Sequence, residues 1–107
     1  MSDIKQLISI IIPVFNESES IGLLLDEVKN VMSFHKFNFE LIVVNDGSKD
    51  NTHQVLKQLT LKIKELSVIS LRKNYGQTAA MSAGFDNSKG DIAVSYTHLT
   101  LPTTNRV

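Results

Sequence analysis

The sequence predicts an α/β protein with a parallel, Rossmann-like sheet in the order β-α-β-α-β-α-β. Residues 7–14 and 39–45 are near-continuous apolar runs, as expected for parallel strands that are covered on both faces. Helix-forming segments separate the predicted strands, and such alternation implies right-handed parallel crossovers. The 107 residues suffice for one small domain or for part of a larger one.

The first half of the chain contains two predicted strands and the helix between them. Residues 7–14 form the first strand, and the polar residues 16–19 that follow it supply N-cap candidates and early acidic groups. A helix is predicted over 18–33 because apolar residues recur there at helical spacing, namely Ile21, Leu24, Leu25, Val28 and Met32. The second strand follows at 39–45.

The second half continues the alternation. Residues 46–52 are dense in turn-forming and capping residues, and a helix is predicted over 51–60, although Leu61 and Ile63 could extend it. A third strand is predicted at 66–71 and a fourth at 91–95. Between them, a helix over 77–87 is rich in small residues, which allow a helix to lie close to a sheet.

Composition excludes several classes of function. The 11 basic and 11 acidic residues balance, so no basic face for nucleic acid is indicated. The absence of cysteine excludes disulfides and cysteine-based metal sites. The three histidines lack metal-ligand spacing.

No apolar run reaches the roughly 20 residues of a membrane span, and the amino terminus lacks signal-peptide features, so a cytoplasmic location is expected.

Both long predicted strands end in small polar or acidic residues. Open α/β sheets bind ligands at the carboxyl ends of their strands, so these residues predict a nucleotide site. Asp46 can accept hydrogen bonds from a base or ribose, and Gly47 permits a positive φ or a close approach. Neither Gly-x-Gly-x-x-Gly after the first strand nor a P-loop is present, which disfavours dinucleotide cofactors and P-loop hydrolysis.

Three motifs in register carry a family resemblance. They are Ile-Ile-Ile-Pro-Val-Phe-Asn-Glu, Val-Val-Asn-Asp-Gly-Ser-Lys-Asp-Asn-Thr, and Arg-Lys-Asn-Tyr-Gly-Gln-Thr-Ala-Ala-Met-Ser-Ala-Gly-Phe, followed by Lys-Gly-Asp. Together they resemble the family 2 inverting glycosyltransferases, which have the GT-A fold. The third motif is most similar to the branch that moves a sugar onto a polyprenyl phosphate. The resemblance implies that residues 1–93 are the amino-terminal, nucleotide-sugar-binding half of a truncated GT-A domain.

The resemblance also implies a set of nucleotide-binding residues. Asp46 is expected to contact the base, with Gly47 and Ser48 shaping its loop. The complete expected set is Pro13, Phe15, Glu17, Asp46, Gly47, Ser48, Arg72, Asn74, Gly76 and Gln77. The implied donor is a UDP- or GDP-linked sugar and the implied acceptor a polyprenyl phosphate, at the cytoplasmic face of the membrane. The donor sugar, the base and the acceptor are not determined by the sequence.

The family pattern breaks near the end of the chain. An Asp-x-Asp motif that binds Mg²⁺ or Mn²⁺ is expected near positions 97 and 99, which hold Thr97 and Leu99. In this family, the acidic residue that would deprotonate the acceptor is expected further along the sequence, beyond the end of this chain. The full-length enzyme is therefore expected to use Mg²⁺ or Mn²⁺. This chain is expected to bind no metal, to contain no catalytic residue and to be inactive alone.

Residues 94–107 have a separate explanation. A DNA string that encodes positions 94–103 resembles a transposon-end sequencing adapter read in one frame. These residues are therefore expected to be a foreign or disordered tail that is joined to a truncated gene, beyond any short fourth strand.

Alternatives remain open at the level of sequence. The chain could be a noncatalytic nucleotide-binding or regulatory module, or a nucleotidyltransferase of related fold, although the Gly-rich loop of the latter is absent. Asn16 and Glu17 could serve only as helix caps. Arg72 and Lys73 could be a solvated strand end.

Overall fold

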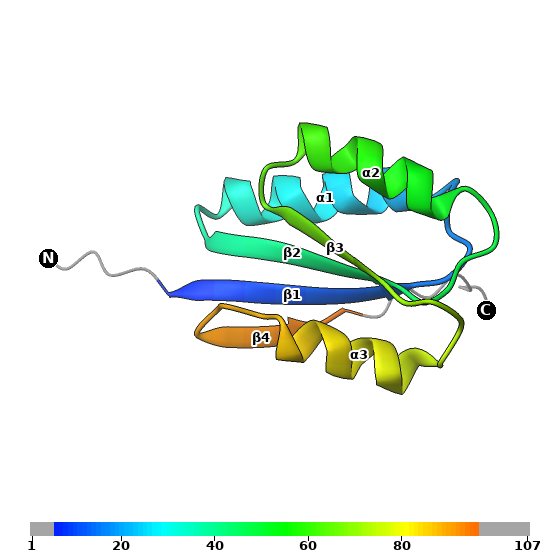
Figure 1. Cartoon of the computed structure of the whole chain (residues 1–107). Coiled ribbons are helices and arrows are strands. Elements are labelled where there is room, and N and C mark those ends of the chain that lie inside the picture. The colour runs from blue at the N-terminus through cyan, green and yellow to red at the C-terminus, as the bar shows by residue number, and fades with distance from the viewer. Residues whose placement is uncertain (1–5, 97–107) are drawn as a thin grey trace, which may run out of the picture.

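The computed structural model describes residues 6–96. It confirms the predicted order of strands and helices (Figure 1). The elements are β1 (Leu7–Val14), α1 (Ile21–Phe34), β2 (Asn38–Asn45), α2 (Thr52–Lys62), β3 (Leu66–Ser70), α3 (Gln77–Asp86) and β4 (Ile92–Ser95).

The four strands form one parallel sheet in the order β3-β2-β1-β4. The two longest strands, β1 and β2, occupy its centre and pair along their whole length, from Leu7 opposite Asn38 to Val14 opposite Asn45. Helices α1 and α2 lie on one face of the sheet and α3 lies on the other (Figure 1). The central strands are therefore covered on both sides, which explains their unbroken apolar sequence.

Successive residues of β1 pack into different layers. Ile10 and Ile12 belong to the larger cluster, which is shared with α1 and α2. Ile11, between them, packs with Ile42 and Ala80 on the α3 side. Burying each such side chain contributes about 1.5–3 kcal/mol, so both faces of the strand stabilise the fold.

Helix α3 lies very close to the sheet. A Cβ atom added at Gly84 would come within 2.4 Å of Ile11 Cγ2, and Ala80 is fully buried. These contacts confirm that the small residues of α3 allow a close approach.

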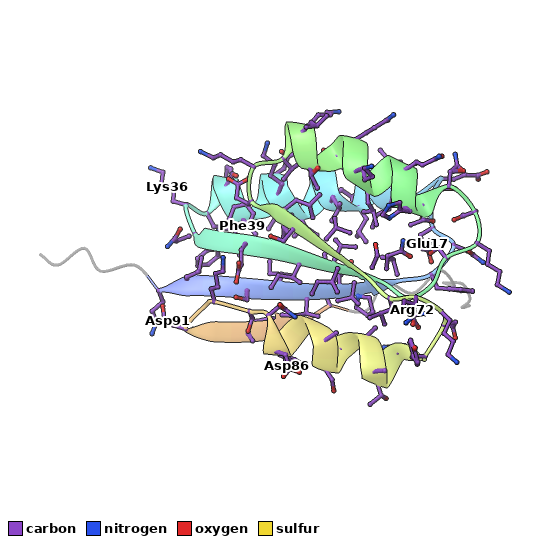
Figure 2. The ribbon with its side chains drawn as sticks, in the orientation of Figure 1. Glu17, Lys36, Phe39, Arg72, Asp86 and Asp91 are labelled. Atoms are coloured by element: carbon purple, nitrogen blue, oxygen red, sulfur yellow. The ribbon has the colours of Figure 1, made fainter. Side chains whose placement is uncertain are left out.

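The Lys-Gly-Asp motif anchors β4 at the amino end of the sheet. Asp91 accepts a hydrogen bond from Leu7 N at 2.9 Å and donates its own N–H to Leu7 O at 2.8 Å. Gly90 N donates to the Ser9 hydroxyl at 2.8 Å, and that hydroxyl donates to the Glu40 carboxylate. Figure 2 shows Asp91 at the opposite end of the sheet from Arg72 and Glu17. The motif therefore fixes the strand pairing and lies away from the loops that carry the first and third motifs.

Several element boundaries differ from the prediction by a few positions. Helix α1 begins at Ile21 rather than at 18: residues 18–20 form a turn in which the Glu17 carbonyl accepts the N–H groups of Ser20 and Ile21, and Asn16 before it is tied to the loop after β2. No acidic residue lies in its first turn, so the early acidic residues precede the helix. Helix α2 extends to Lys62 and not further.

The outer side of β4 is open to solvent. All four residues of this edge strand are exposed. Beside it, a groove of about 480 Å³ runs between β1, β4 and α1. We call this the apolar groove; it is lined by Ile8, Ile10, Glu27, Val28, Val31, Met32, Phe37, Val94 and Tyr96.

The expected tail overlaps the end of the described structure. Val94 and Ser95 belong to β4, which pairs with β1, so the short fourth strand is present. Residues 97–107 lie outside the described residues. The proposed boundary at 93 stays a prediction. None of the helices in the described part is long and apolar enough to cross a membrane.

Candidate functional site

The carboxyl ends of β1 and β2 meet at one edge of the sheet. Val14 and Asn45 are the last paired residues of β1 and β2. Asp46, which follows Asn45, donates its N–H to Val14 O at 2.8 Å. The loop after β1 is then tied to the loop after β2, since Asn16 N donates to Ser48 Oγ at 2.8 Å. The two motifs therefore converge as the sequence predicts.

Asn16 links these loops and does not cap α1. It adopts a positive φ of 54°, and its side-chain oxygen accepts the N–H of Lys49 at 2.8 Å. The next residue, Glu17, donates its N–H to Thr52 Oγ1 at 2.9 Å. The suggestion that Asn16 serves only as a helix cap is wrong, because its hydrogen bonds join the start of α1 to the start of α2.

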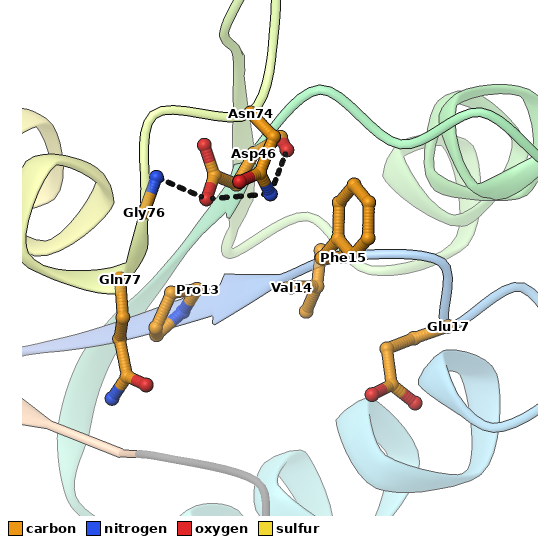
Figure 3. Close-up of a pocket in the computed structure, with 8 residues that line it drawn as sticks. All are labelled: Pro13, Val14, Phe15, Glu17, Asp46, Asn74, Gly76 and Gln77. Carbon is orange, nitrogen blue, oxygen red and sulfur yellow. Dashed lines mark hydrogen bonds between the residues drawn. The ribbon is translucent and has the colours of Figure 1, made fainter.

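The carboxylate of Asp46 organises the loop between β3 and α3. Asp46 is only 4% exposed. One of its oxygens accepts Tyr75 N at 2.8 Å, and the other accepts Gly76 N at 3.0 Å and the Asn74 side-chain amide at 3.2 Å (Figure 3). A carboxylate can accept about four hydrogen bonds. The loop takes three of them.

Gly47 is required where the same two loops touch. Its φ is 70°, in the left-handed region, and an added Cβ would lie 2.3 Å from the Lys73 carbonyl carbon. The sequence predicts a positive φ or a close approach at this glycine, and both are present. The approaching group is the protein backbone itself.

A pocket of about 310 Å³ opens between these loops (Figure 3). We call it the first pocket; its lining is Pro13, Val14, Phe15, Glu17, Asp46, Asn74, Gly76 and Gln77. All of these except Val14 belong to the set that the sequence predicts. Figure 3 shows Gln77 and Glu17 on opposite sides, with Phe15, which is 40% exposed, between Asp46 and Glu17. The first pocket thus combines a buried carboxylate with an accessible aromatic ring.

The remaining predicted residues line a neighbouring pocket of about 520 Å³. These residues are Gly47, Ser48 and Arg72. We call this the cationic pocket; its lining is Asn45, Gly47, Ser48, Lys49, His53, Ser70, Leu71, Arg72, Lys73 and Asn74. Asn74 lines both pockets. The structure therefore divides the predicted set between two pockets, one on each side of the loop that Asp46 holds.

Asp50 stabilises the start of α2. Its carboxylate accepts the Thr52 N–H at 2.9 Å and the Thr52 hydroxyl, and also the Ser18 N–H at 3.4 Å. The hydrogen bond from the Thr52 hydroxyl, more than any other contact, holds the pKa of the Asp50 carboxyl below its usual 3.8. Asp50 is thus an ionised capping residue at neutral pH.

Residues 6–96 contain no group of three or more histidine, aspartate or glutamate side chains that could hold a metal ion. The positions at which the family resemblance places the metal ligands, Thr97 and Leu99, lie outside the described residues.

Sequence comparison identifies relatives of known activity class. The family model described as glycosyl transferase family 2 matches residues 9–96. An undecaprenyl-phosphate 4-deoxy-4-formamido-L-arabinose transferase from Aeromonas hydrophila is 37% identical over 95 residues, covering 88% of this chain and 29% of the relative. A dodecaprenyl-phosphate galacturonate synthase from Rhizobium johnstonii is 39% identical over 86 residues, covering 79% of this chain and 25% of the relative.

Structure comparison finds the same fold in solved structures of other proteins. TarS from S. aureus, residues 1–349, in complex with UDP superposes with a TM-score of 0.69 and 26% identity, covering 88% of this chain and 27% of that one. A mannosyltransferase from Pyrobaculum calidifontis, in complex with GDP-Man and Mn²⁺, has a TM-score of 0.73 at 19% identity, covering 84% and 26%.

The chain spans between 25% and 30% of the length of the curated relatives that it matches. The family match nevertheless includes every element of the sheet and all three helices. The fold is that of the amino-terminal part of a GT-A-like domain. This chain therefore belongs to glycosyl transferase family 2 and is homologous to the amino-terminal region of polyprenyl-phosphate sugar transferases.

Proposed function

We propose that this chain is the donor-binding region of an inverting glycosyltransferase that transfers a sugar from a UDP- or GDP-linked donor to a polyprenyl phosphate. The observation that carries the proposal is the buried Asp46 carboxylate in the lining of the first pocket. A nucleobase presents ring or exocyclic N–H groups that such an acceptor binds.

The remaining lining residues suit a nucleoside. The exposed Phe15 ring offers an apolar face for a base or ribose. Gln77, at the first turn of α3, and Glu17, in the loop before α1, present polar side chains from opposite sides (Figure 3). Asn74 and Gly76 lie in the loop that Asp46 organises. Nucleotide binding and the conformation of this loop therefore depend on the same carboxylate.

The named relatives support the identity of donor and acceptor. Undecaprenyl- and dodecaprenyl-phosphate are the acceptors in the names of the two curated relatives. UDP and GDP-Man occur in complexes of the two similar structures. We propose that the complete enzyme acts at the cytoplasmic face of a membrane, since a lipid acceptor and a water-soluble donor meet at a membrane surface.

Turnover requires groups that residues 6–96 do not provide. Inverting transfer needs a base for the acceptor and stabilisation of the departing diphosphate, which a divalent metal supplies in the complete enzyme. The residues described here bind and orient the donor nucleotide. We therefore propose that the chain alone binds the nucleotide without transferring sugar. Release of UDP or GDP from nucleotide-sugars above the hydrolytic background, with Mg²⁺ or Mn²⁺ present, would contradict this.

Calorimetry with UDP and with GDP tests the binding role. Replacing Asp46 with Ala removes one hydrogen bond to the nucleotide and releases the loop, so we expect about a tenfold to hundredfold loss of affinity. Phe15→Ala should also weaken binding, because it removes an exposed ring without touching the loop. The control is Asp26→Ala, on the exposed side of α1. Equal affinities for all of these proteins and the parent chain would refute the proposed site.

A further inference from the structure

The cationic pocket concentrates positive charge at the carboxyl edge of the sheet. Lys49, Arg72 and Lys73 line it together with His53, and no aspartate or glutamate does. The chain as a whole carries 11 basic and 11 acidic residues, so this separation of charge is local.

Neighbouring carboxylates do not neutralise these cations. Both oxygens of Asp46 bind the loop of residues 74–76, on the far side of the contact between Gly47 and Lys73. Asp50 is held by Thr52 and Ser18, and lines a different hollow. Within residues 6–96, Lys49 and Arg72 have no carboxylate partner at ion-pair distance.

Further features of the pocket favour an anion. The amino terminus of α2 lies beside it, but the ionised Asp50 carboxylate accepts the Thr52 N–H there, so the positive field of the pocket comes from its basic side chains. His53, in that first turn, contacts the Ser70 hydroxyl at 3.1 Å. The Lys73 ammonium lies 5.4 Å from the centre of the Tyr75 ring, an attraction that restrains its long side chain.

We propose that the cationic pocket binds a phosphate group, at a site distinct from the first pocket. A guanidinium and two ammonium groups match the charge and the several acceptor oxygens of a phosphate dianion. The loop held by Asp46 separates this site from the first pocket, and only Asn74 lines both. The phosphate is carried either by a soluble molecule or by a lipid headgroup at the membrane surface.

Titration of the isotopically labelled chain with inorganic phosphate tests the site. At constant ionic strength, amide resonances of Lys49, His53 and Arg72 should shift together. Arg72→Ala should weaken phosphate binding about tenfold, because one charge-assisted contact is lost. Lys57→Ala, an exposed α2 residue outside the lining, is the matched control and should bind like the parent.

A vesicle arm distinguishes the two sources of phosphate. Cosedimentation with phosphatidylglycerol vesicles but not with phosphatidylcholine vesicles, reduced by Arg72→Ala and unchanged by Lys57→Ala, identifies a lipid headgroup. Phosphate-induced shifts without cosedimentation identify a soluble ligand. Shifts that sodium chloride reproduces, or equal binding by Arg72→Ala and the parent chain, would overturn the proposal. UDP and GDP also carry phosphate, so a variant separates the two proposals: Phe15→Ala, which lines only the first pocket, should weaken nucleotide binding and leave the phosphate-induced shifts unchanged.

Discussion

Asp46 and Gly47 act together at the edge of the sheet. The carboxylate accepts the backbone N–H groups of residues 75 and 76, and the glycine next to it leaves room for the backbone of residues 73 and 74. A buried carboxylate that accepts several N–H groups rigidifies its surroundings, since leaving any of these groups unpaired costs about 1–3 kcal/mol. The loop between β3 and α3 is thus set before any ligand binds.

Gly47→Ala tests this packing directly. The added methyl would meet the Lys73 backbone in a left-handed conformation, so we expect a loss of about 1–3 kcal/mol in the free energy of unfolding. Affinity for UDP or GDP should fall as well, because the loop carries Asn74 and Gly76. Urea denaturation and calorimetry measure the two effects.

Gly22→Ala is the control for this substitution. Nothing lies within 4 Å of the Cβ position at Gly22, within α1, so alanine should stabilise by up to about 1 kcal/mol. Equal free energies of unfolding for Gly47→Ala and Gly22→Ala would show that the close approach of the backbone at Gly47 does not restrict the residue at that position.

At the residue scale, the sequence predicted which residues lie at the edge of the sheet more reliably than it predicted which groups they contact. It placed Asp46 at a strand end and anticipated the conformation of Gly47. The partners of Asp46 come from a loop 28–30 residues later, and no local pattern encodes such contacts. Arg72 lines the cationic pocket and not the first pocket because of the side of that loop on which it lies. A linear motif does not reveal this position.

At the element scale, α3 depends on its closeness to β1. Gly84→Ala would push a methyl to within 2.4 Å of Ile11 Cγ2. The strain of overpacking, about 1–3 kcal/mol, should outweigh the gain of about 1 kcal/mol in helix propensity. We therefore expect a lower midpoint in thermal unfolding monitored by circular dichroism. A midpoint equal to or above that of the parent chain would show that α3 can move away from the sheet without cost.

The spacing of apolar residues predicts which segments form strands and helices, whereas contacts between elements determine where each element begins and ends. The apolar runs of β1 and β2 predict strands because both faces are buried. The start of α1 is displaced because Asn16 is engaged with the loop after β2, an interaction across 33 residues. Local capping rules alone place the helix start too early for this reason.

At the scale of the whole molecule, the apolar groove predicts self-association. Val31 is 55% exposed, Phe37 is 50% exposed, and both line the groove beside the open edge of β4. A formal net charge of zero provides no repulsion between copies. We expect concentration-dependent association in sedimentation velocity, reduced by Val31→Lys. Leu61→Lys, at an 88% exposed residue of α2 outside the groove, should leave it unchanged. Purely monomeric behaviour of the parent chain at high concentration would contradict this.

The sequence was sufficient for the architecture because three motifs and the strand-helix alternation agree along the whole described region. It was insufficient for the chemistry of transfer. The chain spans 25–30% of the length of these relatives, and the family resemblance places the metal ligands at Thr97 and Leu99 and the acceptor base further along the sequence.

The parallel pairing of β4 with β1 sets where the polypeptide leaves the sheet. Tyr96 N donates to Ile11 O at 2.8 Å, so β4 ends at the same edge as the loops of Phe15 and Asp46. A group attached a few residues beyond such a strand end is tethered near those loops, since an extended residue spans only about 3.3 Å. A short tether of this kind gives any group that follows such a strand end a high effective concentration near the loops of Phe15 and Asp46.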